Sequence, residues 1–154
     1  MDMTYSVGSR ILKTFQQFLQ YYEASSLACG VVIIKADLGD EQLKLLENHM
    51  HNQKPEVGAQ FSYDASEGLL GILLDDCHLD STHDYSFYVK EFLEQNGQLK
   101  GPLLIGSFPE NGHHAEQMMF SMIWIQMISE SEAKEINIYN HRQNTEVNTF
   151  HPYR

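Results

Sequence analysis

Residues 59–76 read AQFSYDASEGLLGILLDD, and their pattern is the clearest indication of how the chain folds. Residues 57–63 alternate weakly between apolar and polar side chains, whereas Leu69 to Leu74 form a nearly continuous apolar run. The residues between them, 64–68, read Asp-Ala-Ser-Glu-Gly and are typical of a turn. The stretch therefore predicts a β-hairpin whose second strand is buried in a sheet.

The segments on either side of the hairpin complete a β-α-β-β-α-β order. β-branched or apolar runs predict strands at Ala28–Ala36 and Pro102–Phe108. Apolar residues at helical spacing predict helices over Asp37–Gln53 and Ser81–Gln95. This order predicts an α+β, ferredoxin-like fold, with an antiparallel sheet and the helices of that core on one face.

Three further elements are predicted outside this core. A helix over Arg10–Ala24 leads it, and a helix over His113–Ala133 and a short strand at residues 136–138 follow it. The residues from His141 onwards are polar. We therefore divide the chain into an N-terminal helix (1–25), one domain (26–140) and a polar tail (141–154).

Composition narrows the class of protein. The 154 residues suffice for one domain, and the formal charge of −11 argues against nucleic acid or an anionic membrane surface as a partner. No run of eighteen apolar residues and no signal-peptide pattern occurs, so we expect a cytoplasmic protein without membrane insertion. The only cysteines, Cys29 and Cys77, are too few for a disulfide framework or a four-cysteine zinc site.

Four stretches carry a resemblance to a known family. They are Gly30–Asp37, the hairpin stretch at residues 59–76, Leu104–Ser107 (LIGS) and Ala133–Asn137 (AKEIN). Together they resemble a degenerate GGDEF domain, the domain of diguanylate cyclases, from about residue 26 to residue 140. The resemblance implies the palm-like fold that this family shares with class III nucleotide cyclases.

The same resemblance implies that the catalytic chemistry is lost. In the family, one carboxylate at the end of the first strand and one at the hairpin hold Mg²⁺ on GTP, and paired glycines let the nucleotide approach. Here the first strand ends in Lys35-Ala36-Asp37, and the hairpin tip has no Gly-Gly pair. The arginine motif of the family's feedback site also has no match. We expect no cofactor beyond weakly bound Mg²⁺ or GTP.

A remnant nucleotide or metal site is confined to Asp37, Ser66 and Glu67. The alternative for Asp37 is a helix N-cap, and for Glu67 an ordinary turn residue. Residues 75–84 are rich in Asp, His and Cys, but their spacing matches no EF-hand. We therefore expect that stretch to be a solvated loop followed by the start of a helix.

Two apolar helices suggest contact with another protein. Phe15, Phe18 and Tyr22 lie on one face of the leading helix, and residues 118–128 are apolar nearly all round. We take the following as interface candidates: Phe15, Phe18, Tyr22, Met118, Met122 and Trp124. The alternative is that the two helices share one core within the chain.

These observations lead to three functional hypotheses. The first is a catalytically inactive regulatory or protein-interaction module, acting through a protein partner or a homodimer. The second is a non-catalytic sensor that binds GTP or a cyclic dinucleotide in the remnant cleft. The third, an active cyclase with a diverged signature, requires Glu67 to serve without the glycine pair.

Overall fold

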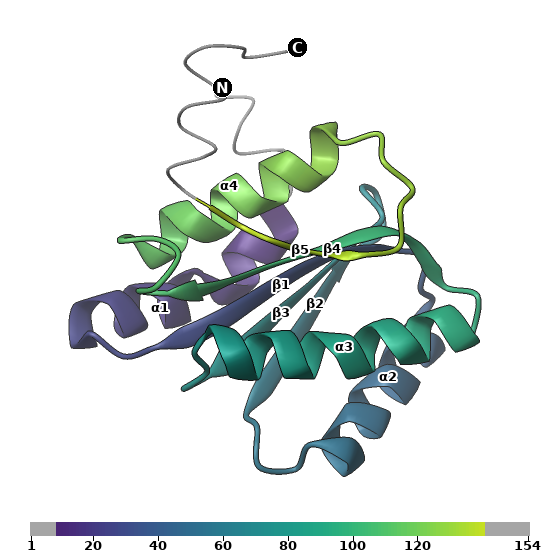
Figure 1. Cartoon of the computed structure of the whole chain (residues 1–154), viewed down its shortest axis with the longest axis horizontal. Coiled ribbons are helices and arrows are strands. Elements are labelled where there is room, and N and C mark those ends of the chain that lie inside the picture. The colour runs from purple at the N-terminus through teal and green to yellow at the C-terminus, as the bar shows by residue number, and fades with distance from the viewer. Residues whose placement is uncertain (1–8, 141–154) are drawn as a thin grey trace.

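The computed structural model describes residues 9–140, so the predicted tail at 141–154 lies outside the described residues. In chain order the elements are α1 (Ser9–Ser25), β1 (Cys29–Ala36), α2 (Asp40–Gln53), β2 (Ala59–Asp64), β3 (Leu69–Asp75), α3 (Leu79–Gln95), β4 (Leu99–Phe108), α4 (Ala115–Ile128) and β5 (Ile136–Ile138) (Figure 1). The fold is thus a mixed α+β arrangement. Within residues 9–140, every helix is too short or too polar to cross a lipid bilayer.

One sheet carries all five strands, in the order β2-β3-β1-β4-β5. β1 pairs antiparallel with both β3 and β4, and β2 pairs antiparallel with β3. The apolar runs of β1 and β3 therefore occupy the middle of the sheet, where both faces of a strand are buried. The four strands of the predicted core are therefore antiparallel where they pair, whereas the additional strand, β5, pairs parallel with β4. The connection through α4 carries the chain back to start β5 in the direction of β4.

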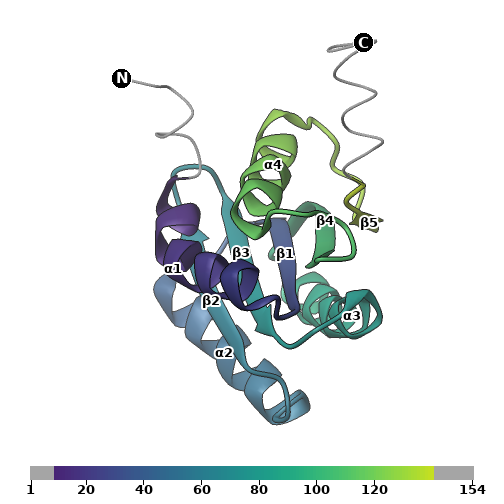
Figure 2. The same ribbon diagram turned by 90° about the vertical axis from the view of Figure 1, so that its left-hand side faces the viewer.

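Helices cover both faces of the sheet. In Figure 1, α4 lies above the sheet, and α2 and α3 lie below it. Alternate residues of β1 divide between the two resulting cores: Val31 and Ile33 pack with α1 and α4, and Val32 and Ile34 pack with α2 and α3. Figure 2 shows the same two layers from the side, with α1 joining α4 on its face.

The leading helix is an integral part of this core. Ile11, Phe15 and Leu19 of α1 are fully buried. The helix lies so close to β3 that a Cβ atom on Gly71 would stand 2.5 Å from Cγ2 of Ile11. A glycine at this position is therefore what lets α1 pack directly on the sheet.

Several predicted boundaries differ from the structure: α2 begins at Asp40 and not at Asp37, and α3 begins at Leu79 and not at Ser81. The last helix ends at Ile128 and not at Ala133, because the backbone turns extended at Ser129 (ψ 132°). The strand predicted from Pro102 begins at Leu99. The N-cap residue of α2 is Gly39, whose N–H donates to the Gln42 side chain at 2.6 Å, so Asp37 is not the cap.

Candidate functional site

The structure brings the end of β1 beside the tip of the β2–β3 hairpin. The N–H of Ala36 donates to the carbonyl of Gly68 at 3.1 Å, and Lys35 stands opposite Leu69 in the sheet. Asp37, directly after β1, and Glu67, directly before Gly68, therefore lie at the same edge of the sheet. Both carboxylates are exposed. This edge is the candidate site that the sequence indicated.

The hairpin tip is organised by its own side chains. Oδ1 of the buried Asp64 accepts hydrogen bonds from the N–H of Ser66 at 3.1 Å and from its hydroxyl at 2.6 Å. Gly68 then adopts a left-handed conformation (φ 63°) that closes the turn. Ser66, one of the predicted remnant residues, therefore stabilises the turn, and its hydroxyl proton is directed at Asp64. Glu67 alone extends its carboxylate from the tip.

Lys35 occupies the first-strand position where the family resemblance places a carboxylate. Its side chain is half-buried on the α4 face of the sheet, and its ammonium donates to the carbonyl of Ser129. That carbonyl follows the last turn of α4, the end of a helix that attracts positive charge. The lysine therefore has a structural role in holding α4 to β1.

The described part of the chain assembles no metal centre. Among residues 9–140, no three His, Cys, Asp or Glu side chains converge in a way that could hold a metal ion. In the ligand-rich stretch, Cys77 is buried, and burial raises the pKa of its thiol to about 11. Its neighbour His78 pairs instead with Glu110, at 3.2 Å. The thiol of Cys77 is therefore protonated at neutral pH and is a poor nucleophile.

Most of the predicted interface residues lie inside the molecule. Phe15, Tyr22, Met118 and Met122 are buried in the core between α1, α4 and the sheet. The interface prediction is therefore corrected for these four, because the chain covers them itself. Tyr22 is further tied down by its hydroxyl, which donates to Asp75 at 2.8 Å.

The other two interface candidates stand on the outside of the same helices. Phe18 of α1 is 43% exposed, and Trp124 of α4 is 42% exposed. Tyr21 and Ile128, on the same two helices, are exposed as well. Whether these side chains bind a protein stays a prediction.

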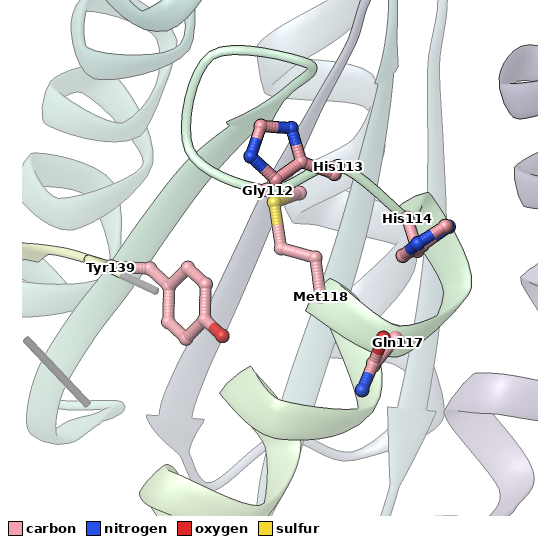
Figure 3. A pocket seen from close by; sticks show the side chains of 6 residues that line it. All are labelled: Gly112, His113, His114, Gln117, Met118 and Tyr139. Carbon is pink, nitrogen blue, oxygen red and sulfur yellow. The ribbon is translucent and has the colours of Figure 1, made fainter. Parts of the chain in front are cut away.

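A second candidate site, which the sequence did not suggest, is a hollow of about 180 Å³ beside the start of α4 (Figure 3). Its lining residues are Gly112, His113, His114, Gln117, Met118 and Tyr139. His113 and His114 are adjacent in the sequence, but no Cys or Asp lies near them at the spacing of metal ligands. Tyr139 could not be connected with them, because only the pairing of β5 with β4 brings it there.

Glu23 of α1 organises the start of α4 next to this hollow. One carboxylate oxygen accepts the N–H of Ala115 at 2.8 Å, and the other lies 3.0 Å from Nδ1 of His114. The hydrogen bond from His114 holds the pKa of Glu23 below its usual value, and the N–H of Ala115 acts in the same direction. Glu23 thus connects α1 to α4 and fixes the orientation of the His114 ring.

Comparison with known proteins supports the fold alone. No protein-family model and no curated protein matches the chain. A solved structure described as a DGC protein from Thermotoga maritima matches with a TM-score of 0.52 and 11% sequence identity. The match covers 74% of this chain and 89% of that chain. The protein therefore has a DGC-like, GGDEF-like fold.

Proposed function

We propose that the chain is a catalytically inactive, GGDEF-like regulatory module of the cytoplasm that acts through contacts with a protein. The observation that carries the proposal is the position of Lys35. A GGDEF-type cyclase needs a carboxylate there to hold Mg²⁺, whereas the ammonium of Lys35 repels a cation and is itself bound to the carbonyl of Ser129.

The hairpin supports the same proposal. The family uses two glycines to bring its backbone close to the nucleotide, whereas this tip is closed by the hydrogen bonds between Asp64 and Ser66. Asp37 and Glu67 alone offer carboxylate oxygens at this edge in the family's positions. Mg²⁺ in a nucleotide site is bound by one or two carboxylates together with the phosphates. Two carboxylates are already few for binding Mg²⁺, and the positive charge of Lys35 weakens that binding further.

The experiment is a cyclase assay on the full chain with GTP and either Mg²⁺ or Mn²⁺, run beside an active diguanylate cyclase. We expect no cyclic di-GMP from this chain. The proposal is wrong if product forms and then disappears in Glu67→Ala while persisting in Glu91→Ala, a matched change of an exposed acidic residue on α3. That result would mean that the hairpin still takes part in cyclase catalysis.

The second candidate function is a sensor that binds GTP or a cyclic dinucleotide without turnover. The placement of Asp37 and Glu67 at one edge favours it, because both carboxylates are free to face a bound Mg²⁺-nucleotide. Calorimetry with GTP, Mg²⁺ and cyclic di-GMP separates the two functions. Saturable binding that is lost in Asp37→Asn and Glu67→Gln supports the sensor, and its absence leaves protein contact as the proposed function.

A further inference from the structure

The hollow at the start of α4 differs from the rest of this acidic protein. The six described residues that line the hollow include no Asp or Glu, although the whole chain carries a formal charge of −11. A larger hollow of about 480 Å³, beside the end of β3, is lined by acidic residues: Glu56, Asp75, Asp76, Asp80 and Asp84. The small hollow is therefore a local exception in charge.

Tyr139 is the strongest indication of a ligand. The residue is only 3% exposed, and its N–H donates to the carbonyl of Ile105 at 2.7 Å, which fixes its backbone. Its hydroxyl points into the hollow, on the side of Met118 (Figure 3). Among residues 9–140 this hydroxyl has no hydrogen-bond partner. The hydroxyl is the part of this buried residue that lines the hollow, so a ligand atom there can accept its hydrogen bond.

The start of α4 supplies further donors. α4 has 14 residues, and its first N–H, that of Ala115, is taken by Glu23. The N–H of Gln117, a lining residue of the hollow, has no acceptor among the described residues. Free N–H groups at the start of a helix carry partial positive charge and favour anions.

Side chains enclose the same space from different directions (Figure 3). His113 comes from the loop before α4, Gln117 from its first turn, and Tyr139 from the end of β5. The loop lies against the helix because Gly112 has no side chain: a Cβ there would stand 3.1 Å from Met118. Two carboxylates also belong to this region, and both are hydrogen-bonded: Glu23 to Ala115 and His114, and Glu116 to Gln16 and Gln20 of α1.

We propose that this hollow binds the phosphoryl group of a small ligand. Hydrogen-bond donors on several sides suit a tetrahedral oxyanion better than a planar carboxylate. The volume is below the range typical of sites for drug-sized ligands, so a single phosphoryl group is the part that fits. The hollow lies at the opposite end of α4 from Ser129, about 20 Å along the helix. The proposal is thus independent of the remnant cyclase site.

The test follows the amide resonances of the full chain by NMR during titration with inorganic phosphate. Sodium chloride at equal ionic strength is the reference. We expect saturable shifts at residues 112–118 and at Tyr139 with phosphate only. Tyr139→Phe keeps the ring and removes the donor, so phosphate affinity should fall about tenfold, whereas Tyr21→Phe, an exposed tyrosine of α1, should leave it unchanged.

A charge variant tests the same site without touching the core. Gln117→Glu places a carboxylate in the hollow and should abolish phosphate binding, whereas Gln17→Glu adds the same charge on exposed α1 and should not. Titration with phenyl phosphate distinguishes the source: tight binding indicates a larger phosphorylated ligand, and exclusion indicates free phosphate. The proposal is overturned if phosphate shifts do not saturate, if Tyr139→Phe binds like the wild type, or if acetate binds as tightly as phosphate.

Discussion

Two polar side chains, Lys35 and Gln126, tie the carboxyl half of α4 to the sheet. Lys35 donates to the carbonyl of Ser129, and the amide of the buried Gln126 donates to the carbonyls of Ile33 and Pro102, both at 2.7 Å. Ile33 and Pro102 lie on β1 and β4, near the point where the register of these two strands shifts. These two side chains therefore add specific hydrogen bonds to the apolar packing of α4 on the sheet.

The contact made by Lys35 can be measured as stability. Lys35→Met removes a charged hydrogen bond that is only half-buried, so the free energy of unfolding should fall by about 1 kcal/mol. Lys35→Glu should cost more, because it adds negative charge beside the carbonyl end of α4. Urea unfolding of both variants checks the order, with Lys44→Glu on exposed α2 as the control. Equal losses for Met and Glu would show that the charge at this position is irrelevant.

Replacing Gln126 should destabilise the protein, because its buried amide donates two hydrogen bonds. Gln126→Leu has a similar size but leaves the carbonyls of Ile33 and Pro102 without this donor, which should cost about 2–4 kcal/mol of unfolding free energy. Gln17→Leu, on the exposed side of α1, should change it by less than about 0.5 kcal/mol. Thermal and urea unfolding measure both values. A neutral Gln126→Leu would mean that the two carbonyls find other donors.

At the scale of elements, α1 is fixed by close packing on the sheet and by the hydrogen bonds that Glu23, near its end, accepts from α4 and the residue before it. Gly71 of β3 allows the approach of Ile11, and Glu23 in the last turns of α1 holds the first residues of α4. Thr14 adds a polar contact to the edge strand, since its hydroxyl lies 3.1 Å from that of Ser62. The helix is therefore locked to β2, β3 and α4 at once.

Gly71→Ala tests the close approach. The new Cβ would overlap Ile11, so α1 has to move and the unfolding free energy should fall by about 1–3 kcal/mol. Gly71→Asp should unfold the domain, because it also buries an unpaired charge. Gly39→Ala is the control, since a Cβ there meets only the Gln42 side chain at 3.5 Å. An unchanged melting temperature for Gly71→Asp would contradict the placement of β3.

The Glu23 contact makes the α1–α4 junction sensitive to acid. The pKa of Glu23 is lowered in the folded protein, so its contribution to stability is present above the unfolded value, near 4.5, and is lost as pH falls through the folded value. Glu23→Gln should therefore flatten the fall in melting temperature below about pH 4.5. Calorimetric scans across this range measure it, with Glu91→Gln on exposed α3 as the control. A wild-type slope in Glu23→Gln would exclude the contact as its cause.

Local sequence patterns predicted the central strands and the turn between β2 and β3. The end of α4 and the role of Lys35 depend on contacts between residues far apart in the sequence, which local patterns do not contain. The apolar runs of β1 and β3 and the turn at residues 64–68 are encoded locally, and the structure has them. The end of α4 is not, since residues 129–133 (SESEA) contain no Pro or Gly to stop a helix. Lys35 reaches Ser129 across 94 positions of sequence, a contact that no local pattern contains.

The candidate sites follow the same division. Asp37 and Glu67 were expected at one edge because the resemblance implied the topology, whereas the role of Lys35 required the position of α4. Phe15 and Tyr22 were recognised as an apolar stripe, but periodicity does not say whether the same chain covers it. Tyr139 lies near the start of α4 because β5 pairs with the edge of β4, and this pairing could not be predicted from the local sequence.

For the whole molecule, two effects oppose each other in self-association: apolar contact through the outer surface of α1 and α4, and repulsion between negatively charged copies. Phe18, Tyr21, Trp124 and Ile128 are exposed on these helices, and such side chains favour contact with a protein. The formal charge of −11 opposes the approach of a second copy. Because salt screens charge and leaves apolar contact intact, the balance between the two depends on ionic strength.

Self-association through this surface should therefore strengthen with salt. At about 0.01 M the screening length is about 30 Å, and at about 0.15 M it is about 8 Å, so repulsion between copies is weakest at the higher value. Light scattering of the full chain should show a higher mass as salt rises. Phe18→Glu should weaken association at least tenfold, because burying one such ring contributes roughly 1.5–3 kcal/mol. Leu45→Glu places the same charge at a 58% exposed leucine on α2, in the opposite helix layer, and should leave association unchanged. If the wild type is a monomer at every salt concentration, and Phe18→Glu keeps every partner that the wild type captures, this surface is not an interface.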